Sequence, residues 1–149
     1  MLILDRLQDP GNIGTMIRTA EAAGYSAIIA IKGTGDVTSP KVVRAAAGSV
    51  LRMPFFLAGS AGEAAEIVKS AGKKLIGTRI TEAVPFYEVD MSSNTALIIG
   101  NEGNGMSDEF AALADTNIMI PMKGQIESLN AAVAAGIVMY NSMINNNIK

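Results

Sequence analysis

Short apolar runs and helical segments alternate along the 149-residue chain, and this alternation limits the folds open to it. Short uninterrupted apolar runs are typical of strands that are buried on both faces of a sheet. Strands are expected at 2–4, 27–31, 53–57, 74–77, 95–99 and 118–120. Helices are expected at 13–23, 41–47, 61–71, 107–113 and 128–143. Strands that alternate with helices predict an α/β fold with a mostly parallel sheet and helices on both faces.

Composition excludes several classes of protein. Hydrophobic residues make up 49% and charged residues 17%, which supplies one core and leaves too little charge for a disordered chain. The sequence has no Cys and no His, so no disulfide, thiolate nucleophile or metal site is expected. No window resembles a membrane span, and Asp5 interrupts the first apolar run too early for a signal peptide. We therefore expect a single cytoplasmic domain over residues 1–149 without membrane association.

The first polar constellation is Asn12-x-Gly14-x-x-x-Arg18, at the turn between the first strand and the first helix. Ligands of parallel α/β sheets collect at the carboxyl ends of strands, where this turn lies. Arg18 shares a helix face with Gly14, and its side chain is expected to lean back toward the turn. Gly14 has no Cβ, so another group can approach its backbone. Taken alone, this motif favours the alternative of a capped helix with a solvated arginine.

The second constellation is a glycine-rich loop after the apolar pair Ile98-Ile99, with the sequence Gly100-Asn101-Glu102-Gly103-Asn104-Gly105. Its spacing differs from the phosphate loop and from the dinucleotide fingerprint. Three glycines would expose backbone amides and carbonyls to a ligand. A simple wide turn has the same composition, so this loop alone leaves both interpretations open.

The third constellation is Ile120-Pro121-Met122-x-Gly124-x-x-x-Ser128-Leu129-Asn130. Ser128 is predicted to be the N-cap of the last helix, and Asn130 to face the same cavity from its first turn. The Ala- and Gly-rich run 131–136 allows close approach of another helix. The alternative is a capped core helix with a small-residue packing face, and this motif alone favours that alternative.

Together, in this order and at these separations, the three motifs resemble the signature motifs of the SpoU (TrmH-type) family of RNA 2′-O-methyltransferases, in the SPOUT superfamily. Residues 39–48 resemble the second helix of that family, and the resemblance covers about residues 2–143. It implies a C-terminal trefoil knot in which about residues 118–143 thread through a loop of the preceding strands, a feature that chains rarely have. It also implies a homodimer with its active site near the subunit interface, with the first and last helices as candidate contact surfaces.

The resemblance further implies that S-adenosylmethionine is the cofactor and is held in the knot, largely by backbone groups. The matching cofactor positions are Thr78, Ile99, Gly100, Asn101, Gly103, Ile120, Met122 and Leu129. The matching catalytic or substrate-positioning residues are Asn12, Arg18, Glu102, Ser128 and Asn130. The implied reaction transfers a methyl group in line from a sulfonium to a ribose 2′-oxygen, and it needs no metal.

The roles of two of these residues stay open. The arginine of this family is often described as a general base, but a guanidinium stays protonated in proteins. We therefore expect Arg18 to hold the ribose or its phosphate and to stabilise developing charge. Glu102 is expected to hold Asn or Arg groups in place, with a simple loop ion pair as the alternative.

The implied substrate is RNA, with ribosomal RNA favoured over transfer RNA. A net charge of −2 is low for a self-sufficient RNA binder. Many members of the family carry an N-terminal RNA-binding domain, whereas this chain begins almost directly at its first predicted strand. We therefore expect either a minimal enzyme that binds RNA through its dimer or an excised catalytic domain, and the acidic balance favours the second. Candidate RNA contacts are Arg6, Arg18, Lys41, Arg44 and Arg52. The alternatives are a non-catalytic RNA- or cofactor-binding module of the same fold and a Rossmann-type nucleotide-binding enzyme.

Overall fold

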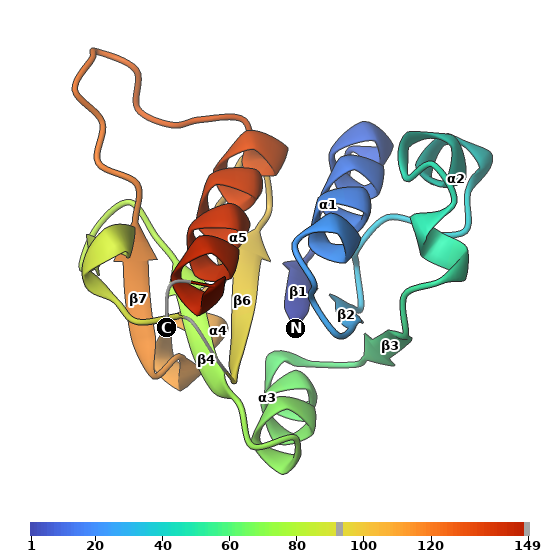
Figure 1. The fold of residues 1–149 in the computed structure, drawn as a ribbon, viewed down its shortest axis with the longest axis horizontal. Coiled ribbons are helices and arrows are strands. Elements are labelled where there is room, and N and C mark those ends of the chain that lie inside the picture. The colour runs from blue at the N-terminus through green and yellow to red at the C-terminus, as the bar shows by residue number, and fades with distance from the viewer. Residues whose placement is uncertain (92–93, 148–149) are drawn as a thin grey trace.

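A computed structural model describes residues 1–91 and 94–147, which form one sheet of seven strands covered by helices (Figure 1). The strands are β1 (Leu2–Asp5), β2 (Ile28–Ile31), β3 (Phe55–Ala58), β4 (Lys74–Thr78), β5 (Val84–Pro85), β6 (Thr95–Gly100) and β7 (Thr116–Met119). Their order across the sheet is β3-β2-β1-β6-β4-β7-β5, and all neighbouring strands run parallel. The predicted parallel α/β fold is confirmed.

The helices lie on both faces of the sheet, as expected. They are α1 (Pro10–Ala22), α2 (Pro40–Ala45), α3 (Ala61–Ser70), α4 (Asp108–Leu113) and α5 (Ala131–Asn147), with short 3₁₀ helices η1 (Ser49–Leu51) and η2 (Phe86–Glu88). In β1, Leu2 and Leu4 join the hydrophobic cluster of α1 and α5, whereas Ile3 joins that of α3 and α4. None of the helices in the described ranges is long and apolar enough to cross a membrane.

Helix α1 begins at Pro10, three residues before its predicted start. The Asp9 side chain accepts a hydrogen bond of 2.7 Å from the backbone N–H of Asn12, which makes Asp9 the N-cap. Proline is favoured in this first turn because its missing N–H would have no partner there. The expected turn at 9–12 is therefore the beginning of the helix, and Asn12 lies within it.

Helix α5 begins at Ala131, and its cap is Asn130. The Asn130 side-chain oxygen accepts hydrogen bonds from the backbone N–H groups of Ala132 at 2.9 Å and Val133 at 3.2 Å. The prediction that Ser128 is the N-cap is wrong. Serine and asparagine are similarly good caps, so residue type alone did not distinguish the two positions. Ser128 instead lies in the connection 121–130, where every residue is exposed.

The order of the strands positions the functional site. Strand β6 returns to lie between β1 and β4, and β7 lies on the other side of β4. Because the strands are parallel, their carboxyl ends meet at one edge of the sheet. This edge brings together the β1–α1 turn, the glycine-rich loop after β6, and the chain that follows β4 and β7.

Candidate active site

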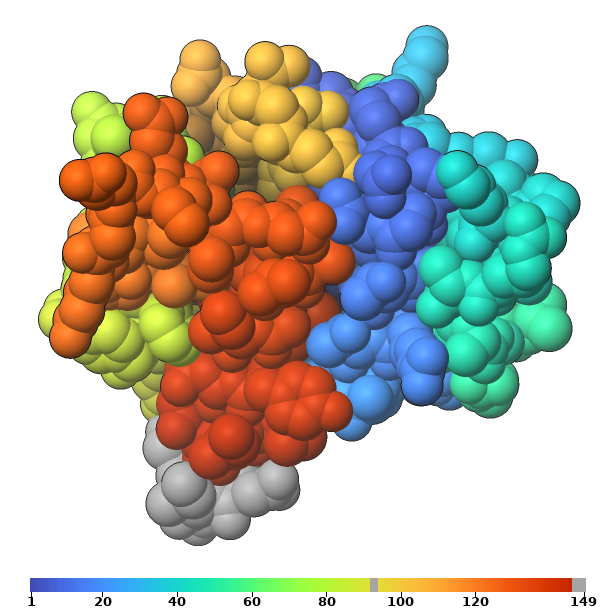
Figure 2. Space-filling view, turned by 90° about the horizontal axis from the view of Figure 1, so that it is seen from above, coloured from blue at the N-terminus to red at the C-terminus, as the bar shows by residue number. Residues whose placement is uncertain are grey.

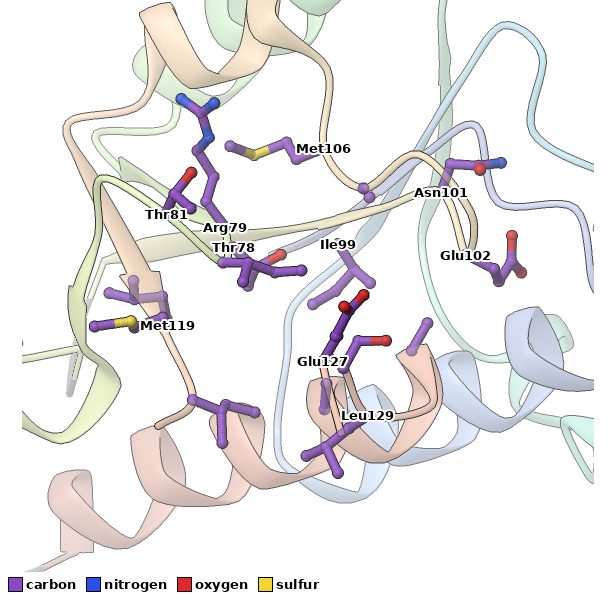
Figure 3. A pocket seen from close by; sticks show the side chains of 18 of the residues that line it. Thr78, Arg79, Thr81, Ile99, Asn101, Glu102, Met106, Met119, Glu127 and Leu129 are labelled. Atoms are coloured by element: carbon purple, nitrogen blue, oxygen red, sulfur yellow. The ribbon is translucent and has the colours of Figure 1, made fainter. Parts of the chain in front are cut away.

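A cavity of about 590 Å³ lies at the carboxyl ends of β4, β6 and β7, which is a usual size for a small-molecule site. Ten residues singled out in the sequence line it: Thr78, Ile99, Gly100, Asn101, Glu102, Gly103, Ile120, Met122, Ser128 and Leu129. Figure 3 shows several of their side chains around the cavity. In Figure 2, the gold surface around residues 100–110 lies next to the orange connection before α5. The second and third motifs therefore share one cavity.

The glycine-rich loop turns back on itself tightly. Backbone hydrogen bonds of 3.0 and 2.8 Å join Asn101 and Gly105 in both directions, and Gly105 has a φ of +70°. A Cβ at Gly100 would collide with the backbone of Gly105 and Met106. The glycines thus allow a closed return rather than a wide turn, and the loop presents its backbone to the cavity.

The turn after β1 holds this loop in place from the side. The Asn101 side-chain amide donates a hydrogen bond of 2.8 Å to the Arg6 carbonyl. The buried Asp5 carboxylate accepts one of 2.7 Å from the backbone N–H of Ser107, beyond the loop. The role of Asp5 was not predicted from the sequence, although a carboxylate that ends an apolar strand is a signal for such a contact.

Glu102 is held by hydrogen bonds and not by a cation. Its carboxylate accepts from the backbone N–H groups of Gln8 and Asp9, both at 3.0 Å, and from the Asn12 side-chain amide at 3.4 Å. Desolvation raises the pKa of Glu102, but these hydrogen bonds, with one from its own backbone N–H, outweigh it and leave the pKa below its ordinary value. The second motif is thereby joined to the first.

Asn12 links the third motif to the other two. The Asn130 side-chain amide donates a hydrogen bond of 3.0 Å to the Asn12 side-chain oxygen. Neither asparagine lines the cavity. The chain of hydrogen bonds from Glu102, which lines the cavity, through Asn12 to Asn130 therefore runs along the rim.

Arg18 is exposed on α1 and does not line the cavity of its own chain. The group that approaches the bare backbone of Gly14 is α2. A Cβ at Gly14 would lie 2.5 Å from the Ala45 Cβ and 2.7 Å from the Val42 carbonyl oxygen. Gly14 thus serves helix packing. The expectation that all three motifs converge on one cavity is wrong for Arg18, which lies outside the cavity of its own chain.

The cavity wall is acidic. Its ionisable residues in the described part of the chain are Arg79, Glu102, Asp108 and Glu127. Arg79 pairs with Asp108 at 3.7 Å and with Glu82 at 3.5 Å. Three carboxylates beside one cation favour a cationic ligand over a polyphosphate. Arg79 and Glu127 were not predicted from the sequence as site residues, because neither belongs to a recognised motif.

This wall fits S-adenosylmethionine, which carries a positive sulfonium, better than a dinucleotide with two phosphates. The apolar side chains of Ile99, Ile120 and Leu129 suit an adenine ring. The Rossmann-type alternative is therefore disfavoured. No group of three or more potential metal-ligating side chains occurs within residues 1–91 and 94–147.

The chain is also similar in sequence to known RNA methyltransferases. The family model for the SpoU rRNA Methylase family matches residues 1–140. The 23S rRNA (guanosine(2553)-2'-O)-methyltransferase RlmP of Bacillus subtilis is 42% identical over 141 residues, which are 95% of this chain and 56% of that protein. The chain spans about half the length of the curated relatives it matches.

Two solved structures share the fold over 99% of this chain. The SpoU methyltransferase AviRb from Streptomyces viridochromogenes, in complex with the cofactor AdoMet, gives a TM-score of 0.93 at 34% identity, over 60% of its chain. A second structure, which concerns the 2-OH methylation of C/U34 on tRNA, gives a TM-score of 0.86 at 27% identity, over 96% of its chain.

The parallel sheet, its strand order and the cavity at its carboxyl edge define a methyltransferase fold of the SPOUT class, for which the trefoil knot is expected. Within that class, this chain belongs to the SpoU rRNA methylase family.

Proposed function

We propose that the chain is the catalytic part of an S-adenosylmethionine-dependent RNA ribose 2′-O-methyltransferase, with ribosomal RNA as its substrate. One observation carries the proposal: Asn12 bridges Glu102 and Asn130 at the rim of an acidic cavity. The relative named for 23S rRNA 2′-O-methylation, at 42% identity, supports the choice of reaction and of RNA. An RNA substrate also agrees with a cytoplasmic location.

The residues of the cavity have complementary roles in this proposal. When bound, S-adenosylmethionine supplies an electrophilic methyl group. The backbone of the glycine-rich loop and the apolar Ile99, Ile120 and Leu129 hold the nucleoside part. At the rim, Asn12 and Asn130 have amide groups that can orient the ribose, and Glu102 fixes Asn12. Ser128 offers a hydroxyl on the cavity wall that can reach the same ribose.

A homodimer is part of the proposal, because α5 is apolar on both sides. One side is buried through Ala132, Ala135, Val138 and Met139. The other carries Val133 (53% exposed), Ile137 (38%), Tyr140 (40%) and Ile144 (49%). Their spacing of four, three and four residues forms a single stripe, as in helices that pair with another helix. A second copy of α5 would cover it.

We assign Arg18 to the cavity of the partner in this dimer. Helices α1 and α5 lie side by side (Figures 1 and 2), and the Thr19 methyl carbon lies 3.8 Å from the Cβ position of Gly136. Arg18 is exposed on α1, the helix that packs beside α5, so a partner that covers α5 would come close to the helix that carries Arg18. A guanidinium that reaches across would hold the ribose or its phosphate and stabilise developing charge.

Three of the five candidate RNA contacts are free to bind phosphate. Arg6 pairs with Asp5 at 2.9 Å, and Arg52 pairs with Glu21 at 2.7 Å through its terminal nitrogen. Arg18, Lys41 and Arg44 are exposed, and no ion pair within the described ranges involves them. Arg18 lies on α1, and Lys41 and Arg44 lie on α2, the helix that packs against α1. We propose that an RNA-binding region outside residues 1–149 adds further contacts.

Transfer RNA is the second candidate substrate, because the structure concerned with tRNA methylation matches over nearly its whole length. The test supplies methyl-labelled cofactor and unmodified transcripts of 23S rRNA and of tRNA. The proposal expects label in the ribosomal transcript. Label only in tRNA would select the alternative, and cofactor binding without any transfer would indicate a non-catalytic module.

A further inference from the structure

The four ionisable side chains of the cavity differ in how far their charges are neutralised. Arg79 and Asp108 pair with each other, and Arg79 also pairs with Glu82. Glu102 is surrounded by amide donors. Glu127, in contrast, has neither a hydrogen bond nor an ion pair within the described part of the chain. Its carboxylate is thus the one uncompensated charge on the described cavity wall.

The position of Glu127 makes this charge available to a ligand. Figure 3 shows its side chain directed into the cavity toward Ile99, above Leu129. Ile99 and Leu129, which line the same cavity, are apolar, and a ligand that fills the space would displace water from around the carboxylate. Removing water strengthens the interaction between the carboxylate and any charge on that ligand.

We propose that Glu127 is a specificity-determining residue, through which the cavity selects the cationic methyl donor over its neutral demethylated product. This inference rests on the proposed use of S-adenosylmethionine. At neutral pH the donor carries one more positive charge than S-adenosylhomocysteine, and the two are otherwise nearly identical in shape. A carboxylate on the wall therefore stabilises the donor and does little for the product, so methyl transfer itself weakens binding and favours product release.

Titration calorimetry on the full chain measures this preference directly, with S-adenosylmethionine and S-adenosylhomocysteine as separate ligands. Glu127→Gln keeps the size of the side chain and removes the charge. We expect it to weaken donor binding about three- to tenfold and to change product binding less than about twofold. Glu127→Asp keeps the charge and should keep the preference. Glu66→Gln, which removes an exposed carboxylate on α3, is the matched control and should change neither affinity.

Ionic strength supplies a second readout. Salt should reduce the preference of the unchanged protein for the donor more than it reduces that of Glu127→Gln. Equal weakening of both ligands by Glu127→Gln, or no weakening of either, would overturn the inference and leave the proposed function standing. If neither ligand bound to the unchanged protein, the proposed cofactor would be wrong, and the inference would fall with it.

Discussion

The side-chain amide of Asn130 donates a hydrogen bond of 3.0 Å to the side-chain oxygen of Asn12, across 118 residues of sequence. Each partner has a second contact: Asn130 caps α5, and Asn12 donates to Glu102. The start of the last helix, the start of the first helix and the glycine-rich loop are therefore connected at the rim of the cavity. A change at any of the three should alter how the other two are held.

Two substitutions separate the capping role of Asn130 from its contact with Asn12. Asn130→Asp keeps an oxygen that can cap α5 but has no N–H to donate to Asn12. We expect it to retain the stability of the protein and to lower the rate of methyl transfer by about tenfold or more, because misplaced groups at a reacting centre are costly. Asn130→Ala should lose the rate and also about 1 kcal/mol of stability. Urea unfolding and single-turnover transfer rates measure the two effects, and equal rates for Asn130→Asp and the unchanged protein would contradict the account.

Gly14 should be intolerant of alanine, although alanine favours helices. Gly14→Ala places a methyl group against Ala45 and the backbone of α2, so we expect a loss of about 1–3 kcal/mol from overpacking. In Gly62→Ala, the added carbon lies 3.7 Å from the nearest atom, the Ser60 hydroxyl oxygen. That control should gain about 0.4–1 kcal/mol, since alanine restricts the unfolded chain. Thermal unfolding measures the change in stability of both variants. A stabilising Gly14→Ala would show that α2 does not pack as described.

The sheet could be predicted from the sequence, whereas the links between its loops could not. Buried parallel strands such as β1 and β6 are nearly continuous apolar runs, so local composition reveals them. The bond between Asn12 and Glu102 depends on β6 returning beside β1, and the bond between Asn12 and Asn130 depends on α5 packing beside α1. No local pattern encodes either arrangement. The fit between Gly14 and α2 is equally non-local, because a helical glycine has the same sequence signal whether a ligand or a helix approaches it. The knot entered only through family resemblance, for the same reason.

Acid should weaken the fold partly through Glu102. Its pKa in the folded protein lies below the ordinary value of 4.5, so its contribution to stability is fully present above about pH 4.5 and is lost as the pH falls through the folded-state pKa. Glu102→Gln cannot be protonated and should show a shallower loss of stability below that pH. Urea unfolding between neutral and acidic pH measures the difference, with Glu66→Gln as the control. Parallel pH profiles for Glu102→Gln and the unchanged protein would argue against the described hydrogen bonds.

Mixed dimers can show whether Arg18 acts in the cavity of its partner. Arg18→Ala removes the guanidinium, and Leu129→Arg places a cation on the cavity wall, which should exclude a cationic cofactor. Each variant alone should be inactive. When the two are mixed and allowed to exchange subunits, a site composed of an intact cavity and the other subunit's Arg18 should restore about a quarter of the activity in a random mixture of subunits.

The exposed stripe of α5 supplies the control for this experiment. Ile137→Asp, added to both variants, should give a folded monomer and abolish the restored activity, because a charge in an apolar interface disfavours pairing. Leu51→Asp introduces the same charge at an exposed apolar residue outside the stripe and should leave restoration intact. Absence of restoration in dimers that do form would place the action of Arg18 within its own subunit.

The chemical position of the transferred methyl group tests the central claim most directly. Alkaline cleavage of RNA uses the 2′-hydroxyl as its nucleophile, so a 2′-O-methyl group protects the adjacent linkage. RNA labelled by the protein with methyl-labelled S-adenosylmethionine is digested in alkali, and the products are separated by size. The account predicts label in alkali-resistant dinucleotides, lost in Arg18→Ala. Label in mononucleotides would mean that the methyl group is on a base, and would contradict a ribose 2′-O-methyltransferase.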